Sequence, residues 1–159
     1  MQPQLERILL LKRVPLFALL RTDQLAHVVP LLEPVGWPAQ ARVFDKGEPG
    51  TEMYLIVSGR IGISLHDDPA RRDFVTELGP GDCFGEMGML DDRPRSASAH
   101  VLVDTEALAL GKERLHGLLL AYPELGIGVL RALSRRLRET NAALLEQRRG
   151  EPNGKTTAE

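Results

Sequence analysis

The chain has 159 residues, a formal net charge of −2 and a hydrophobic fraction of 43%, which suits one domain with a core of its own. This charge balance gives no electrostatic reason to expect a nucleic-acid partner. The single cysteine, Cys83, excludes an internal disulfide and a cysteine-based metal site, and we interpret it as a small buried apolar residue.

Residues 1–34 are predicted to form a helical lead-in. Apolar residues at helical spacing across 5–16 predict an amphipathic helix that packs on this domain or on a larger parent. The apolar run 8–20 is interrupted by two basic residues and a proline, so it neither spans a bilayer nor makes a signal peptide. We therefore expect a cytoplasmic protein without membrane contact of its own. A second helix is predicted with Thr22 as its N-cap, continuing to about residue 32 and ended by Pro34.

Residues 35–111 have the pattern of an all-β region. Short apolar segments are bounded by glycine and proline at intervals typical of such folds. Ile61, Ile63 and Leu65 recur at every second position, and so do the apolar residues of 97–103, which indicates strands with one buried face. Because no helical spacing separates these strands, we predict a mainly β fold, an antiparallel jelly roll (double-stranded β-helix) flanked by helices.

Residues 112–146 return to helical spacing and are predicted to form two helices, separated at Pro123. The longer helix carries a heptad-like seam, which either mediates a homodimer or packs on the chain's own roll. The seam residues are Leu130, Leu133, Leu137, Thr140 and Leu144. Residues 147–159 are polar and are predicted to be a disordered tail, and we expect no room for a helix-turn-helix in this chain.

The segment 84–99, which reads FGEMGMLDDRPRSASA, contains the groups needed to hold a small phosphate diester. Gly85 lets the backbone approach a ligand, and the short helix after it presents free N–H groups to an anion. Arg95 adds a permanent charge in a planar fork, and Ser96 adds a hydroxyl donor. Glu86 repels a phosphate but can accept a hydrogen bond from a sugar hydroxyl. Together these groups describe a nucleotide site; the alternative is that Glu86 and Arg95 merely pair over a surface turn.

Here the sequence resembles the cyclic nucleotide-binding domain family, the module of catabolite activator-type regulators, cyclic-nucleotide-dependent kinases and gated channels. FGE at 84–86 and PRSA at 94–97 are similar to the phosphate-binding cassette of that family. The glycine-rich segment 47–59 and the turn 79–82 resemble its hairpin and the turn before the cassette, so that the match covers most of the chain. The resemblance implies that the ligand is cAMP, and less readily cGMP, although Ser96 does not settle the choice of base.

The resemblance also implies roles for individual residues. The implied contacts are Gly85, Arg95 and Ser96 for the phosphate, Glu86 for the ribose, and Phe84 and Met87 for the cassette backbone. In the resembling bacterial regulators the final helix is both lid and dimer interface, and Thr140 and Asn141 match positions that contact the base there. The period-two pattern adds Ile63 and Val75 as candidates for the apolar wall of the pocket, with ordinary core as the alternative.

The expected function is a regulatory domain that binds a cyclic nucleotide and reports occupancy by moving its C-terminal helix, without a DNA-binding domain of its own. It would act as a homodimer or with a fused or partner effector domain. The alternative is a roll of the same fold that binds no nucleotide and serves dimerisation or docking. An enzyme is not expected, because the histidines are isolated in sequence and no metal or nucleophile arrangement is legible.

Overall fold

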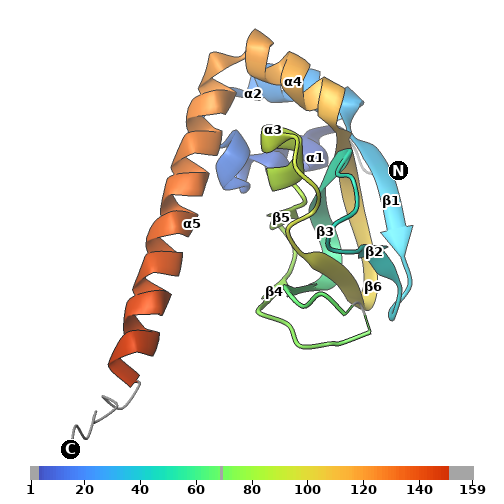
Figure 1. Cartoon of the computed structure of the whole chain (residues 1–159). Helices are drawn as coiled ribbons and strands as arrows, with labels where there is room; N and C mark the ends of the chain where they lie inside the picture. Colours follow the sequence, from blue (N-terminus) through green and yellow to red (C-terminus); the bar gives the residue numbers. More distant parts are fainter. Residues whose placement is uncertain (1–3, 69, 151–159) are drawn as a thin grey trace, which may run out of the picture.

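The computed structural model describes residues 4–68 and 70–150, with an antiparallel β-roll that follows the N-terminal helices in the chain and precedes the C-terminal ones; α1, α2 and α4 gather at one end of the roll (Figure 1). One six-stranded sheet forms the roll: β6 pairs with β1, β2 and β3, and β3 also pairs with β4 and β5. The strands are β1 (Glu33–Trp37), β2 (Arg42–Phe44), β3 (Glu52–Ser64), β4 (Thr76–Leu78), β5 (Cys83–Phe84) and β6 (Ser98–Gly111). These pairings are antiparallel, which confirms the predicted fold class.

Helices stand at both ends of the chain, and one short helix interrupts the roll. They are α1 (Gln4–Lys12), η1 (Pro15–Phe17), α2 (Thr22–Val28), η2 (Val29–Leu31), α3 (Met87–Asp91), α4 (Lys112–Ala121) and α5 (Pro123–Gly150). Within the roll, β3 and β6 pair over nearly their whole length with shifts of register between Ile56 and Ile61. Gly59 lies in this irregular region at φ +102°, and a Cβ there would lie 2.2 Å from Thr105 Oγ1. Only glycine therefore fits this bend.

The N-terminal helices pack on this domain. In α1, Ile8 and Leu11 are buried in a core shared with α2, α4 and α5, whereas Leu5 and Leu9 are 62% and 50% exposed. The amphipathic lead-in predicted from the sequence is thus present, with a narrower buried face than expected.

The predicted start and end of the second helix need correction. Its N-cap is Arg21 rather than Thr22, and the Arg21 N–H donates to Gln24 Oε1 at 2.9 Å. The α-helix ends at Val28 and continues as the 3-10 turn η2. The cause is Pro30, which has no N–H for an α-helical hydrogen bond.

The outer face of the roll is covered near the start of β6, so the prediction of one buried face for 97–103 is wrong. His100 is 5% exposed and Val103 is 45% exposed. The connection between β3 and β4 places Phe74 over His100, with ring centroids 5.4 Å apart. This burial lowers the pKa of His100, and Arg72 and Arg42 lower it further against the opposing effect of Asp45.

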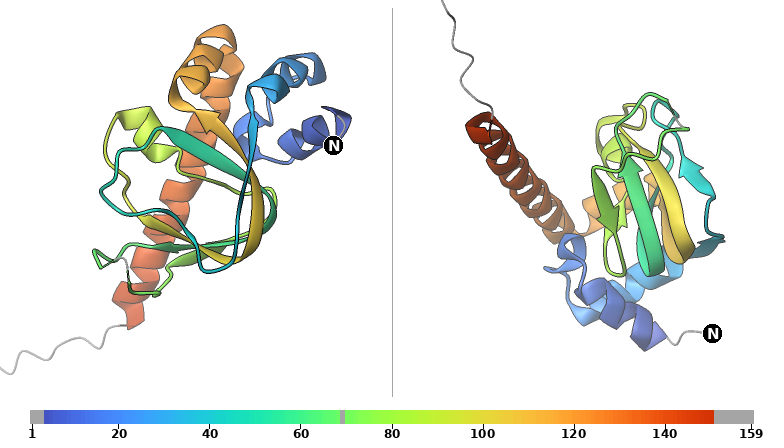
Figure 2. Two further views of the ribbon diagram at one scale, coloured as in Figure 1. Left: turned by 90° about the vertical axis from the view of Figure 1, so that its right-hand side faces the viewer. Right: turned by 90° about the horizontal axis from the view of Figure 1, so that it is seen from below.

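α5 starts beside α4 and extends beyond the roll (Figure 2). It is helical through Gly150, so residues 147–150 are not the predicted disordered tail. Arg148 and Arg149 favour a helix there, because arginine is a good helix former and its charge suits a helix C-terminus. The rest of the predicted tail, 151–159, is outside the described residues. Among those described, no single helix is long and apolar enough to cross a membrane; α4 and α5 meet that criterion only together, as a pair bent by 113°.

The heptad-like seam predicted on α5 is covered only in part. Leu133 packs against the core. Leu130, Leu137 and Leu144 are 67%, 61% and 53% exposed, and we call these three residues the leucine stripe. Thr140 lines a cavity next to the roll. The seam is therefore partly a packing face and partly an uncovered apolar face.

Candidate functional site

A cavity of about 610 Å³ opens between the cassette, β4 and one side of α5, within the size range of small-molecule sites. We call it the cassette pocket. All but one of the site residues predicted from the sequence line it: Ile63, Val75, Phe84, Gly85, Glu86, Met87, Arg95, Ser96 and Thr140. The exception is Asn141, which does not line the pocket. It lies about 140° around the helix from Arg136 and about 160° from Ala143, which both line the pocket, and therefore faces another direction.

Arg95 lies at the floor of this pocket and is only 6% exposed. Its Nη1 donates to the Gly85 carbonyl at 2.8 Å, and its Nη2 donates to the Glu52 carbonyl at 2.7 Å. The guanidinium carbon is 4.0 Å from the centroid of the Phe44 ring, a cation–π contact. The guanidinium is thus held in place by the roll itself.

The backbone around Arg95 is held equally firmly. The Arg95 N–H donates to the Glu48 carbonyl at 2.8 Å, and the Arg95 carbonyl accepts from the Gly47 N–H at 2.9 Å. Gly85 has φ +83°, and a Cβ at that residue would lie 2.7 Å from Arg95 Nη1. Glycine is therefore required at 85 for the side chain of Arg95 to reach the backbone.

The charge of Arg95 has no ion-pair partner in the part of the chain that the structure describes. Its Nε is buried and forms no hydrogen bond with any of the described residues. Burial lowers the pKa of Arg95, against the raising effect of nearby Tyr54 and acidic residues. A buried cation with unused donor capacity is costly unless an anion approaches it, so this part of the pocket is suited to an anionic ligand.

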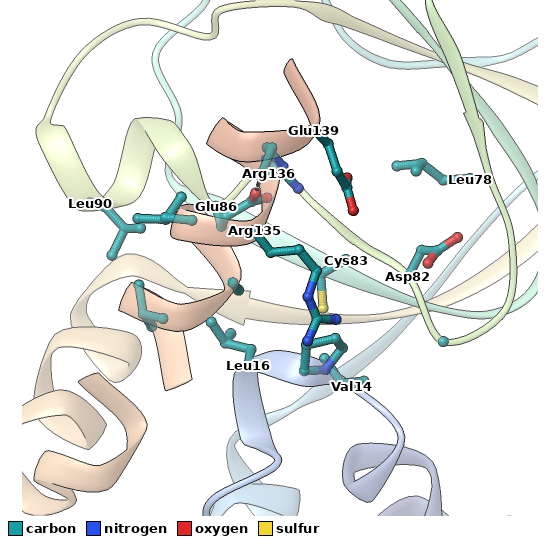
Figure 3. A pocket seen from close by; sticks show the side chains of 15 residues that line it. Val14, Leu16, Leu78, Asp82, Cys83, Glu86, Leu90, Arg135, Arg136 and Glu139 are labelled. Carbon is teal, nitrogen blue, oxygen red and sulfur yellow. Dashed lines mark hydrogen bonds and ion pairs between the residues drawn. The ribbon is translucent and has the colours of Figure 1, made fainter. Parts of the chain in front are cut away.

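Glu86 is the second buried charged residue of the pocket, at 9% exposed. It immediately precedes α3 and does not pair with Arg95. Its Oε1 instead accepts from Arg136 Nη1 of α5 at 2.5 Å (Figure 3). The proposed surface pairing of Glu86 with Arg95 is thus wrong, and Glu86 connects the cassette to the C-terminal helix.

The remaining predicted residues surround these two charges. Phe84 is 3% exposed and belongs to the core of the roll, and Met87 is 43% exposed at the start of α3. Val75 is 61% exposed and lines the pocket together with Ile63. Ser96 is exposed at the mouth. The pocket thus has a buried charged floor and an apolar, more open upper part.

The comparison with known proteins agrees with this arrangement. The sequence profile of the cyclic nucleotide-binding domain matches residues 34–122. The chain belongs to the cyclic nucleotide-binding domain family.

Similar proteins include transcriptional regulators and kinase regulatory subunits. The domain is 34% identical over 137 residues to the CRP-like cAMP-activated global transcriptional regulator of Mycobacterium tuberculosis, covering 86% of this chain and 61% of that protein. It is 32% identical over 109 residues to the cAMP-dependent protein kinase regulatory subunit of Aspergillus fumigatus, covering 69% of this chain and 26% of the subunit. The chain thus spans about three fifths of the length of the bacterial regulator.

The structural comparison gives the same family. The crystal structure of the catabolite activator protein from Thermus thermophilus superimposes with a TM-score of 0.74 at 34% identity, covering 82% of this chain and 61% of that one. Among the residues that the structure describes in this cyclic nucleotide-binding domain, no three histidine, cysteine or acidic side chains gather in a way that could hold a metal ion.

A smaller cavity of about 260 Å³ lies on the other side of the Glu86–Arg136 pair, between η1, α5 and the turn before β5 (Figure 3). Cys83 lines it and is partly buried rather than fully buried as predicted, and this burial raises the pKa of its thiol. Arg136 and Glu139 of α5 border both cavities.

Sequence reasoning missed four residues that shape the cassette pocket of this domain. Phe44 and Glu52 come from strands far from the cassette in sequence, and no local pattern marks them. For Arg136 the sequence did contain a usable signal. It precedes Thr140 by four residues, so the two side chains lie next to each other on one side of the helix once Thr140 is placed in the pocket. Glu139 is adjacent to Thr140 in sequence.

Proposed function

We propose that this chain is a regulatory domain whose ligand is cAMP, in preference to cGMP. The observation that carries this proposal is the buried Arg95, which lines the pocket and has neither a carboxylate partner nor a hydrogen bond from its Nε among the described residues, while the same pocket contains the buried carboxylate of Glu86. A cyclic phosphate supplies the missing negative charge, and Ser96 at the mouth adds a donor. Glu86 accepts from the ribose 2′-hydroxyl. Two relatives are named for cAMP, the transcriptional regulator of Mycobacterium tuberculosis and the kinase regulatory subunit of Aspergillus fumigatus, and they support the same ligand.

The Glu86–Arg136 pair provides a route from occupancy to signal. Without ligand, Arg136 uses Glu86 as its partner and so connects α5 to the cassette. A ribose hydroxyl that donates to Glu86 competes with Arg136 for the same carboxylate. Ligand binding therefore shifts α5 only if the ligand binds one arrangement of this helix more tightly than the other. The shift in the equilibrium between the two arrangements is limited by that difference in affinity.

The proposal is tested by calorimetric titration of the purified protein with cAMP and cGMP separately. We expect one site per chain, tighter for cAMP. Glu86→Gln should weaken cAMP but leave 2′-deoxy-cAMP nearly unchanged, and the exposed Glu113→Gln serves as the matched control. Absence of binding for both nucleotides would leave the alternative, a roll used for dimerisation or docking. If Glu86→Gln loses the same affinity for cAMP and for its 2′-deoxy analogue, Glu86 does not contact the ribose 2′-hydroxyl.

We also propose that α5 pairs with a second copy of itself. The leucine stripe repeats every seven residues, the spacing of a coiled-coil seam, and it is uncovered in the single chain. Leu137→Glu should convert the dimer to a monomer in sedimentation velocity. Leu120→Glu is the control, because Leu120 is 86% exposed on α4 and lies outside the stripe. A wild-type protein that sediments as a monomer at all concentrations would contradict the pairing.

A further inference from the structure

The apolar wall of the cassette pocket is carried in part by a weakly supported strand. Val75 and Thr76, at the start of β4, line the pocket together with Ile63 of β3. β4 has three residues and, among the described strands, pairs with β3 alone. The Val75 N–H adds one hydrogen bond, to the Ile63 carbonyl at 2.8 Å. Because a short two-stranded pairing is only marginally stable by itself, this wall needs a further anchor.

Phe74 provides such an anchor on the outer face of the roll. Its ring covers Gly62 and His100, which are cross-strand partners in β3 and β6. The centroids of the Phe74 and His100 rings are 5.4 Å apart. Gly62 and Ile63 follow each other in β3 and therefore face opposite sides of the sheet. The Phe74 ring thus lies on one side of β3, while its chain neighbour Val75 lines the pocket on the other side.

The roll gives up stability at two places to hold this ring. A Cβ at Gly62 would lie 2.8 Å from the ring of Phe74, although the backbone of Gly62 is outside the positive-φ region. Glycine is therefore needed there for the ring and not for the backbone, inside a strand that a glycine weakens. The Nε2 of His100, beneath the same ring, is buried and forms no hydrogen bond with any described residue. Both features lower the stability of the fold, which favours a role for the docked ring in function.

We propose that Phe74 is a positioning residue for the cyclic nucleotide. The inference rests on the proposed function and adds a residue that does not line the pocket. With the phosphate at Arg95, the apolar part of the ligand, its base, packs on the wall that includes Val75. Docking of Phe74 on Gly62 fixes the backbone at Val75 before the ligand arrives, so less ordering of the wall opposes binding. Arg72, whose guanidinium carbon is 6.0 Å from the Phe74 centroid, adds a weak cation–π contact to the same anchor.

The test is calorimetric titration with cAMP of variants that circular dichroism shows to be folded. Phe74→Ala should bind about tenfold more weakly, the size expected when a side chain and its backbone must be ordered on binding. Gly62→Ala should weaken binding in the same way, because its methyl group displaces the ring. Phe74→Leu, which keeps an apolar side chain over Gly62, should bind within about threefold of the wild type. Asp73→Ala is the control, since Asp73 is exposed beside Phe74 and does not line the pocket.

A double-mutant cycle separates positioning from a general loss of stability. If Phe74 acts through Val75, Phe74→Ala should cost less than about twofold in cAMP affinity once Val75 is already replaced by alanine. A loss that persists undiminished in the Val75→Ala background overturns the role of Phe74 and leaves the cyclic-nucleotide function intact. So does a Phe74→Ala protein that binds cAMP within about twofold of the wild type. A wild-type protein that binds no cyclic nucleotide refutes the proposed function and this inference together.

Discussion

Replacing Arg95 with alanine should destabilise the ligand-free protein as well as remove the phosphate contact. The guanidinium makes two hydrogen bonds to buried carbonyls, of Gly85 and Glu52, and packs over Phe44. Each hydrogen bond to a charged group contributes about 1.5–3 kcal/mol. Removing a cation that is buried without an ion-pair partner offsets part of this loss. We expect the free energy of unfolding to fall by about 2–4 kcal/mol, which corresponds to roughly 4–16 °C in Tm for a chain of this size.

The measurement is urea unfolding followed by circular dichroism, with and without cAMP. Arg93→Ala is the matched control, because Arg93 is exposed and only two residues away. Saturating cAMP should stabilise the wild type and the control by the amount that its dissociation constant dictates, and should leave Arg95→Ala unchanged. If Arg95→Ala unfolds within about 1 kcal/mol of the wild type in the absence of nucleotide, the guanidinium does not support the roll and the reasoning fails.

Three further perturbations test other parts of the structure. Because burial lowers the pKa of His100, the folded protein favours its neutral form. The free energy of unfolding should therefore fall as the pH drops below about 6.5. This fall should be smaller in His100→Gln. Gly59→Ala should cost about 3 kcal/mol in urea unfolding through clash and strain, whereas Gly79→Ala, with open space around it, should cost less than about 1 kcal/mol. Arg136→Ala breaks the pair with Glu86 and should speed amide exchange along α5 in the ligand-free protein; unchanged exchange would show that the pair does not hold the helix.

The cassette could be predicted from the sequence because its parts are close together in the chain. A glycine, a carboxylate, a proline and an arginine within 84–97 form one turn, one short helix and one return to a strand, so spacing alone fixes which groups face the same cavity. The antiparallel roll was predicted for a similar reason, since glycine and proline mark its turns directly. Both results depend on local chemistry that sequence expresses well.

The partners of these groups could not be predicted in the same way. Arg95 is held by the carbonyls of Gly85 and Glu52, and backbone carbonyls leave no mark on the sequence. The burial of His100 depends on where the β3–β4 connection folds, which period-two alternation does not encode. The prediction for Asn141 failed because it depended on the rotation of α5 about its own axis. An error of one residue along a helix turns a side chain by about 100°.

The two sides of the cassette pocket are not held equally firmly in the protein. The arginine that would receive the phosphate is fixed by the roll before any ligand arrives, so little ordering is left to oppose binding there. The other side of the pocket belongs to α5, which carries the uncovered leucine stripe on a neighbouring face and, among the described residues, forms one ion pair with the cassette, between Arg136 and Glu86. If the proposed function holds, the β-roll supplies the phosphate anchor, whereas the response to the ligand depends on α5. Substitutions on α5 would then alter the response while the phosphate anchor stays intact, which makes this helix the place to engineer a sensor with a new output.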